Sequence, residues 1–219
     1  FSEAGANGAF PLDDRSALEI MITPRPVLSP PRNRYVYFPE AAEVPESQAV
    51  NVRNRSYTIG ALVDIPGAGA EGVLFAHGGI AGGHSLYVKD RQLHYVYNWL
   101  GEKFQAATSD RDVPTGKHVL TAEFQKTGDD EQTKSATGTL TLYVDDEPVG
   151  KAEIMTQPGF FALAGDGLSV GRDSASPVSQ DYQAPFAFSG GAIDRVVVDV
   201  SGDHYVDHEK EILAYLARD

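Results

Sequence analysis

From Ser56 to Val200 the chain consists of short runs in which apolar and polar residues alternate. The runs are rich in β-branched and aromatic residues and are separated by Gly, Asp and Asn, which is typical of strands joined by turns. In Gly138–Val144, the two leucines and the final valine share one face of an extended chain, and the two threonines and the tyrosine share the other. About ten such runs follow one another at hairpin spacing. This pattern predicts an all-β protein built as an antiparallel sandwich.

Turn residues between adjacent runs predict which strands pair with each other. Asp90–Arg91 and Asp145–Pro148 each connect two runs, and Asp is frequent in tight turns. Each connection therefore predicts an antiparallel hairpin. The strands of these hairpins and two later strands are predicted at Ser85–Lys89 with Gln92–Trp99, Gly138–Val144 with Val149–Ile154, Leu168–Gly171 and Ala192–Val200.

The two ends of the chain lack this alternation. Seven of the 13 prolines lie within residues 11–45, and each proline restricts its own φ and the residue before it. Residues 1–55 are therefore predicted to form an extended strap with one short helix at Asp14–Ile20. Within the strap, Tyr35–Phe38 is predicted to add an edge strand to the sandwich. At the other end, acidic residues followed by an apolar stripe predict a helix over His208–Arg218.

The composition argues against several classes of partner. Acidic residues outnumber basic ones by 31 to 18, and the net charge of −13 repels nucleic acids and anionic membranes. No stretch approaches the roughly 20 apolar residues that span a bilayer, and no signal peptide is visible at the first residues. The absence of cysteine removes disulfides and cysteine metal sites, but it leaves the cellular compartment open.

Histidines, an amide and aromatic residues form the candidate ligand face. His77 and His84 flank a glycine-rich connection, where the backbone could approach a ligand closely. The alternative is a plain connection between two strands. On the run that ends at Trp99, one face carries that aromatic residue and the other carries His94 and Asn98. Either face could be a sugar-binding platform while the other packs in the core, and alternation does not distinguish them.

Four aspartates in predicted loops are candidate ligands for a hard cation. Carboxylate and carbonyl oxygens are the ligands that Ca²⁺ prefers. The sequence therefore predicts calcium as the ion if any ion binds, and solvated turn acids are the alternative. The four residues are Asp110, Asp112, Asp166 and Asp173.

The order of several motifs resembles that of concanavalin A-like, laminin-G-type domains. These motifs are Leu86–Tyr95, Gly116–Phe124, Leu140–Gly150, Leu168–Arg172 and Phe188–Val196. The expected fold is therefore an all-β concanavalin A-like jelly-roll sandwich over residues 56–219, with an N-terminal Pro-rich strap and a short C-terminal helix. Arg172, which ends one of the motifs, joins the candidate ligand-face residues.

Nearly the whole chain also resembles the C-terminal region of long bacterial arylsulfatases of the type I sulfatase family. The stretches that carry this resemblance are Phe10–Arg15, Ser29–Tyr37, Arg53–Tyr57 and Glu71–Ala76. The resemblance implies that Phe1–Arg15 ends an alkaline-phosphatase-like catalytic core and that the β domain is appended to it. Such enzymes use a formylglycine, made from Cys or Ser in a C/S-x-P-x-R motif, beside a divalent cation. Ser29–Asn33 has Asn where this motif needs Arg, so the catalytic motif is expected upstream of Phe1.

Three functions are compatible with these observations. The first is a non-catalytic accessory domain that packs on a sulfatase core, stabilises it and borders its substrate entrance. The second is a free-standing carbohydrate-binding module. The third is a glycoside hydrolase, which needs two carboxylates beside the scissile bond. Only Glu123 lies near the centre of a predicted strand, and no E-x-D-x-x-E pattern occurs. No catalytic residue is therefore assigned to this chain, which is expected to be inactive alone.

Overall fold

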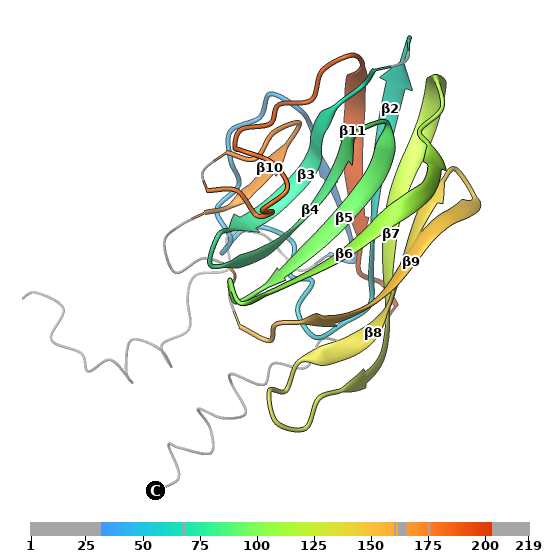
Figure 1. Cartoon of the computed structure of the whole chain (residues 1–219). Coiled ribbons are helices and arrows are strands. Elements are labelled where there is room, and N and C mark those ends of the chain that lie inside the picture. Colours follow the sequence, from blue (N-terminus) through green and yellow to red (C-terminus); the bar gives the residue numbers. More distant parts are fainter. Residues whose placement is uncertain (1–31, 68, 160, 162–165, 175, 203–219) are drawn as a thin grey trace, which may run out of the picture. The chain divides into compact units, whose positions relative to one another are not determined.

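The alternating runs form eleven strands among the residues that the structure describes, which are 32–67, 69–159, 161, 166–174 and 176–202 (Figure 1). The strands of this computed structural model are β1 (Arg34–Tyr37), β2 (Tyr57–Ile65), β3 (Gly72–Gly79), β4 (Gly82–Lys89), β5 (Gln92–Trp99), β6 (Lys103–Asp112), β7 (Gly116–Asp129), β8 (Ala136–Val144), β9 (Glu147–Thr156), β10 (Leu168–Val170) and β11 (Ala192–Asp199). They pair into a six-stranded sheet, β1-β11-β2-β7-β8-β9, and a five-stranded sheet, β10-β3-β4-β5-β6. The predicted all-β antiparallel sandwich is confirmed.

Both predicted hairpins are confirmed, and their backbone geometry explains the residues in the turns. In the β4–β5 hairpin, Asp90 and Arg91 adopt positive φ values of 49° and 68°. Two consecutive positive φ values are typical of a type I′ turn, whose twist matches that of the paired strands. In the β8–β9 hairpin, Asp145 has a φ of 54°, and β9 already begins at Glu147. The connection is therefore shorter than the predicted four residues.

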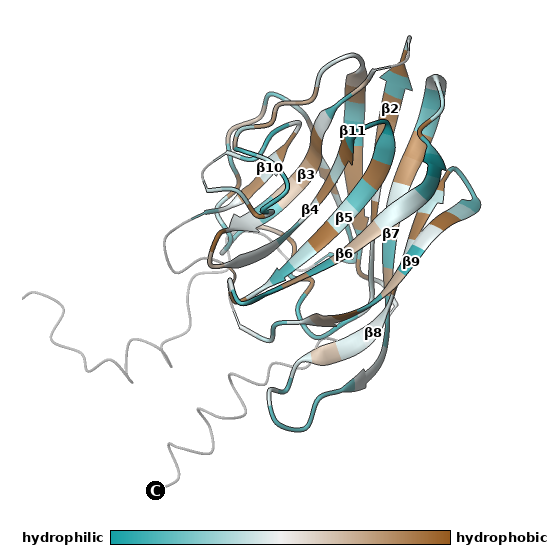
Figure 2. Cartoon of the chain, in the orientation of Figure 1, coloured by the Kyte–Doolittle hydropathy of each residue, from teal (hydrophilic) through white to brown (hydrophobic). Residues whose placement is uncertain are grey.

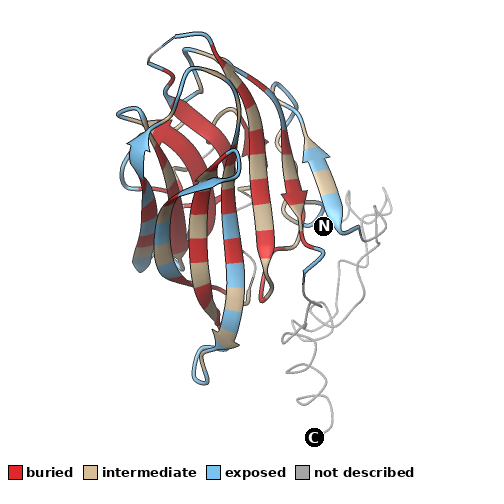
Figure 3. Ribbon diagram, turned by 90° about the vertical axis from the view of Figure 1, so that its right-hand side faces the viewer, coloured by how far each residue is buried: buried red, intermediate tan, exposed pale blue. Residues whose placement is uncertain are grey.

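Alternate residues of the strands fill the space between the two sheets. In β2, every second residue from Tyr57 to Ile65 is buried, and the residues between them are partly exposed. Figure 3 shows the same alternation as stripes along the strands, and Figure 2 shows that hydropathy alternates with it. Val196, Val198 and Val200 are buried, as the alternation predicts. Removal of this apolar surface from water is the main favourable contribution to folding.

The outer face of the five-stranded sheet is partly covered by the segment between β10 and β11. Val178 and Tyr182 of this segment pack on Tyr87 and Val96 in a second apolar cluster. Asp173 holds the segment in place, because its carboxylate accepts hydrogen bonds from Val178 N at 2.9 Å and from the Tyr182 hydroxyl at 2.7 Å. As a result, β3 is buried along its whole length.

Additional contacts bind the edges of the sheets. The amide of Gln105 in β6 donates to Met155 O at 2.8 Å and accepts from Met155 N at 2.9 Å in β9, so one side chain bridges an edge of each sheet. The predicted edge strand at Tyr35–Phe38 is confirmed as β1, which pairs with β11. Val44 pairs with Leu168 of β10. Residues that precede Ser56 therefore take part in the sandwich.

The predicted helices at Asp14–Ile20 and His208–Arg218 lie outside the described residues, as does most of the strap. The described residues form no helix. They accordingly include no helix with the length and hydropathy that a membrane span requires.

Candidate functional site

A pocket of about 310 Å³ opens at the end of the sandwich where β2 and β6 end and β3, β5 and β7 begin. We call this the pocket end. Its apolar lining includes Ile65, Val88 and Val113, which come from three different parts of the chain. It is also lined by an ion pair in which Arg91 Nη2 lies 2.6 Å from Asp112 Oδ2. The volume is at the lower limit of the range for small-molecule sites.

Local backbone geometry holds the two charged residues together. Arg91 is the second of the two central residues of the type I′ turn, and its carbonyl accepts a hydrogen bond from Val113 N at 2.7 Å. This bond fixes the turn against the residue that directly follows Asp112. Gly69, which also lines the pocket, has a φ of 119°, a conformation that residues with a Cβ rarely adopt.

A charged histidine supports the loop that forms one wall of the pocket. His118 Nε2 lies 3.1 Å from the carbonyl oxygen of Thr115, and Nδ1 lies 2.9 Å from Asp145 Oδ2. Because both oxygens act as acceptors, both ring nitrogens donate and the ring is protonated. The hydrogen bond to the Asp145 carboxylate raises the pKa of His118 accordingly.

The ion pair offers both donors and acceptors to a ligand. The side chains of Arg91 and Asp112 are 61% and 52% exposed, so water screens their attraction and the pair adds little to stability. A guanidinium carries five N–H donors, and a carboxylate has several acceptor positions on its two oxygens. Their mutual contact leaves most of these groups available, next to an apolar surface. This combination suits a small ligand that has both hydroxyl groups and C–H surface.

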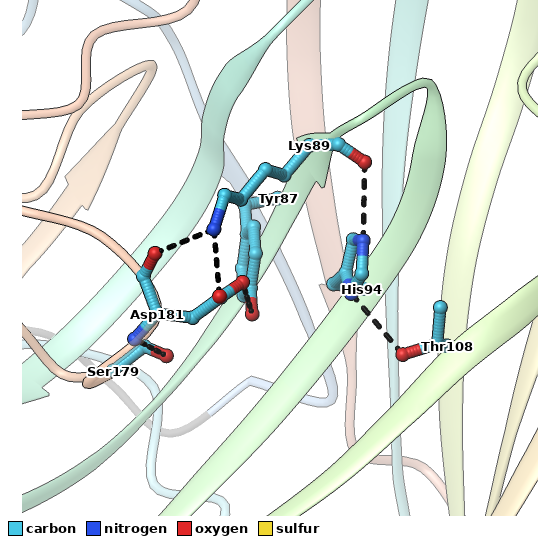
Figure 4. A network of polar contacts seen from close by, with 6 residues as sticks. All are labelled: Tyr87, Lys89, His94, Thr108, Ser179 and Asp181. Carbon is cyan, nitrogen blue, oxygen red and sulfur yellow. Dashed lines mark hydrogen bonds and ion pairs between the residues drawn. The ribbon is translucent and has the colours of Figure 1, made fainter.

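A second group of polar residues lies on the outside of the five-stranded sheet (Figure 4). Lys89 Nζ donates to Asp181 Oδ1 at 2.7 Å and to the Asp181 carbonyl at 2.8 Å, and the Tyr87 hydroxyl donates to Asp181 Oδ2 at 3.0 Å. The hydrogen bond from Lys89 lowers the pKa of Asp181. These contacts fasten the covering segment to β4.

His94, one of the predicted ligand-face residues, belongs to this same network. Its Nε2 donates to the Lys89 carbonyl at 3.1 Å, so its Nδ1 accepts from the Thr108 hydroxyl, also at 3.1 Å. The ring stacks on Tyr87 with 5.0 Å between centroids and 7° between planes. Burial lowers the pKa of His94, which keeps the ring neutral at pH 7. Both ring nitrogens are therefore occupied by internal contacts.

The predicted ligand residues His77 and His84 lie at the opposite end of the sandwich, which we call the histidine end. They face each other across β3 and β4, their ring centroids are 5.6 Å apart, and both side chains are buried in the core. Within the part of the chain that the structure describes, both ring nitrogens of His77 and Nε2 of His84 have no hydrogen-bond partner. Burial lowers the pKa of His77 to about 3 and lowers that of His84 as well. Buried rings of this kind are not accessible to a ligand at the surface.

The glycine-rich connection between these histidines is a tight hairpin. A Cβ on Gly83 would lie 2.3 Å from the His77 carbonyl oxygen, so only glycine permits this approach of the two strands. Asn98 is also fully buried and braces the hairpin. Its amide donates to Gly79 O at 2.9 Å and to Ile80 O at 3.1 Å, and its side-chain oxygen accepts from Gly101 N at 2.9 Å.

The remaining predicted ligand-face residues make structural contacts. Trp99 Nε1 donates to Ser135 Oγ at 3.1 Å, and Arg172 Nη2 donates to the Ala41 carbonyl at 3.0 Å. Glu123 lies on the outer face of the six-stranded sheet, where its carboxylate accepts a hydrogen bond from the Tyr143 hydroxyl at 3.0 Å. Neither Trp99 nor Arg172 lines the pocket, and neither does Glu123, the acid considered for glycoside hydrolysis.

The four predicted calcium ligands contact separate partners. Asp112 pairs with Arg91, Asp110 pairs with Arg111, and Asp166 accepts a hydrogen bond from Ser176 Oγ at 2.6 Å. Asp173 is the buried residue that holds the covering segment, and burial raises its pKa. Within the described ranges, no group of three or more His, Asp or Glu side chains is placed to hold a metal ion.

Sequence reasoning missed Arg91 as a residue that lines the pocket. It assigned Arg91 only a place in a hairpin turn, and it treated Asp112 as a metal candidate without a partner. The turn itself carries a signal for Arg91. The second central position of a type I′ turn strongly prefers glycine, so an arginine there is unusual. A residue that a turn does not favour is a reason to look for another role.

No protein-family model and no curated protein matches the chain. Among solved structures, the chain is similar to the CBM40 domain of a Ruminococcus gnavus IT-sialidase bound to α2,3-sialyllactose. The sequence identity is 14%, the TM-score is 0.46, and the match covers 83% of this chain and 97% of that one. The same domain bound to α2,6-sialyllactose gives 14% identity, a TM-score of 0.44 and coverage of 83% and 96%. This likeness concerns the β-sandwich and assigns no ligand.

Proposed function

We propose that this domain is a non-catalytic carbohydrate-binding module of the concanavalin A-like type and that it binds a sugar in the pocket beside Arg91 and Asp112. The observation that carries the proposal is the pairing of an exposed donor and acceptor with an apolar surface in one pocket. Neighbouring hydroxyl groups of a sugar can accept from a guanidinium and donate to a carboxylate. The C–H surface of the sugar ring can then lie on Val113 and Pro114, the apolar lining residues that reach the surface.

Binding without bond cleavage is favoured by the number of carboxylates in the pocket. Glycoside hydrolysis generally uses two carboxylates on either side of the scissile bond. Asp112 is the one carboxylate among the residues that line the pocket, and it is already paired with Arg91. Glu123, the other acid considered, lies on the outer face of the other sheet.

The test is a titration of the ¹⁵N-labelled chain with monosaccharides and disaccharides at millimolar concentration, read by amide chemical shifts. We expect saturable shifts at Gly67, Gly69, Arg91 and Val113, and we expect Arg91→Gln to abolish them. Arg111→Gln is the matched control, because Arg111 lies on β6 next to Asp112 and does not line the pocket. Shifts confined to other regions, or no shifts with any sugar, would refute this function.

A second candidate function is that of an accessory domain packed on a sulfatase core. Ile80 and Leu100 are 63% and 47% exposed, and they occupy adjacent turns at the histidine end that Asn98 braces. Two rigidly held apolar side chains at a surface are suited to packing against another domain. The partner would be a catalytic core that carries the formylglycine and its divalent cation, as the sequence resemblance implies.

This second function has its own test. The coding sequence upstream of Phe1 should contain a C/S-x-P-x-R motif. If it does, Ile80→Ser with Leu100→Ser should lower the melting temperature of the longer polypeptide and leave that of the 219-residue chain nearly unchanged. A longer polypeptide that lacks the motif, or that is indifferent to both substitutions, would exclude the accessory function.

A further inference from the structure

The two charged residues of the pocket neutralise each other, and we propose that the pocket selects uncharged sugars over anionic ones. This inference rests on the carbohydrate-binding function proposed above and concerns the class of sugar. It follows from the charges around the site, which differ from those of a pocket built to bind a carboxylate or a sulfate.

Arg91 is the one cationic residue among those that line the pocket, and it is not available as an isolated charge. Its guanidinium lies 2.6 Å from the carboxylate of Asp112. An anionic group that approaches Arg91 must therefore also approach Asp112 or displace it. Like charges brought together across an interface are a common means of rejecting the wrong partner.

The residues beside the ion pair in the turn and on β6 add further negative charge, and His118 behind the pocket wall is paired with the carboxylate of Asp145. Asp90 precedes Arg91 in the turn, and Asp110 lies two residues before Asp112 on β6. The nearest basic neighbour on β6, Arg111, pairs with Asp110 and with Glu147, at 3.0 Å and 3.1 Å. The chain as a whole carries a net charge of −13. Among the described residues that line the pocket, no cation besides the paired Arg91 is present to receive a carboxylate or sulfate group.

An uncharged sugar meets no such penalty. The N–H groups of Arg91 that do not contact Asp112 can donate to one hydroxyl oxygen, and the carboxylate of Asp112 can accept from the neighbouring hydroxyl group. Both residues keep their mutual contact while they bind. The ion pair then supplies one donor and one acceptor and has no net charge. Two neighbouring hydroxyl groups of a sugar also supply an acceptor and a donor without a net charge, so the two pairs are complementary.

The experiment compares matched neutral and anionic sugars on the whole 219-residue chain. The probes are galactose with galacturonic acid, glucose with glucuronic acid, and the methyl ester of N-acetylneuraminic acid with the free acid, each titrated to millimolar concentration and followed by amide shifts of the pocket. We expect at least one neutral sugar to bind about ten-fold more tightly than the anionic sugars. Its affinity should not change between low and high salt, because screening acts on charges.

Substitution of Asp112 tests the mechanism of this selectivity. Asp112→Asn retains the size of the side chain and removes its charge. The affinity for the neutral sugar should fall about ten-fold, since a neutral amide oxygen is a weaker acceptor than a carboxylate, and the affinity for its anionic counterpart should rise. Glu123→Gln, which removes a charge on the outer face of the six-stranded sheet, should leave the order of affinities unchanged. Melting curves of both variants verify that they are folded.

The outcomes separate the inference from the function on which it rests. If only anionic sugars shift the pocket amides, the selectivity is refuted and carbohydrate binding stands. If Asp112→Asn leaves the affinities for neutral and anionic sugars unchanged, the proposed role of the ion pair is refuted. If no sugar of either class shifts the pocket amides, the carbohydrate function itself fails and the inference fails with it.

Discussion

The two ends of the sandwich differ in whether their polar side chains are exposed to water or buried. At the pocket end, Arg91 and Asp112 form an ion pair in contact with water, beside an apolar surface. At the histidine end, His77 and His84 are enclosed in the core, and three of their four ring nitrogens have no partner among the described residues. Polar groups at a surface keep their hydration and can exchange it for a ligand, whereas buried polar groups without partners reduce stability.

The difference shows which features point to binding and which to folding. Histidines beside a glycine-rich connection look like a functional site in the sequence, but their burial makes them part of the core. An arginine in a turn looks unremarkable, but its exposure next to a pocket makes it available for binding. The position of a polar residue relative to the core therefore says more about function than its chemical type does.

The largest expected effect is a loss of stability in acid that originates at the histidine end. The pKa of His77 is about 3 in the folded chain, lowered by burial and by the charge of Arg53, and the pKa of the neighbouring His84 is also lowered. Below about pH 6.5, the unfolded chain therefore takes up protons that the folded chain does not. Between pH 7 and pH 5, the free energy of unfolding should fall by about 2 kcal/mol through His77 and further through His84, as measured by urea denaturation.

Two substitutions isolate this contribution from that of the carboxylates. His77→Leu removes the proton uptake and the unpaired nitrogens, so the variant should lose less stability than the original chain between pH 7 and pH 5. His118→Asn should lose more stability than the original chain between pH 7 and pH 5. The raised pKa of His118 contributes stability at low pH that is lost as the pH rises through that pKa, and the variant lacks this contribution. If His77→Leu kept the full acid sensitivity, the histidine end would not be its source.

The next largest effect concerns the side chain that braces the hairpin. Asn98→Ala removes both donors from the Gly79 and Ile80 carbonyls and the acceptor from Gly101 N. Because the residue is fully buried, the free energy of unfolding should decrease by about 2–4 kcal/mol. At the pocket end, Arg91→Gln should cost less than about 1 kcal/mol, because it breaks only an exposed ion pair. Equal costs at the two ends would contradict the contrast between them.

A third prediction separates folding from binding at the pocket end. Asp90→Asn combined with Arg91→Gly creates the turn that a type I′ hairpin favours, since both positions have positive φ. The free energy of unfolding should increase by up to about 1 kcal/mol. Sugar binding should nevertheless be lost, because the donor of the pocket has been removed. Retained binding in this more stable variant would show that Arg91 does not contact the ligand.

Much of the strand pattern could be predicted from the sequence, because alternation and turn residues report directly on local structure. The burial of His84 could also be predicted from the sequence. The predicted β4–β5 hairpin places His84 opposite Tyr97 and Leu86 opposite Tyr95, so the histidine shares the face of these apolar partners.

The pocket could not be predicted in the same way. Its walls come from the end of β2, the turn before β5 and the loop after β6, which are far apart in the sequence. They meet only because the two sheets pack in one particular strand order, and alternation within a strand carries no information about that order. Arg91 and Asp112 can form an ion pair because β5 pairs with β6 and Gln92, the residue after Arg91, lies opposite Asp112.

The smallest expected effect is that of calcium at the pocket end, where two of the predicted ligands lie. Asp112 is engaged with Arg91 and Asp110 with Arg111, so a cation would have to break an ion pair to bind either carboxylate. A change from chelator to millimolar calcium should therefore shift the melting temperature by less than about 1 °C, with magnesium as the control for ionic strength. A larger increase that is specific to calcium, and that Asp110→Asn removes, would instead establish the site that the sequence predicts. It would also mean that the carboxylates of this end exchange their arginine partners for a metal ion, and the neutral character of the pocket would then depend on calcium.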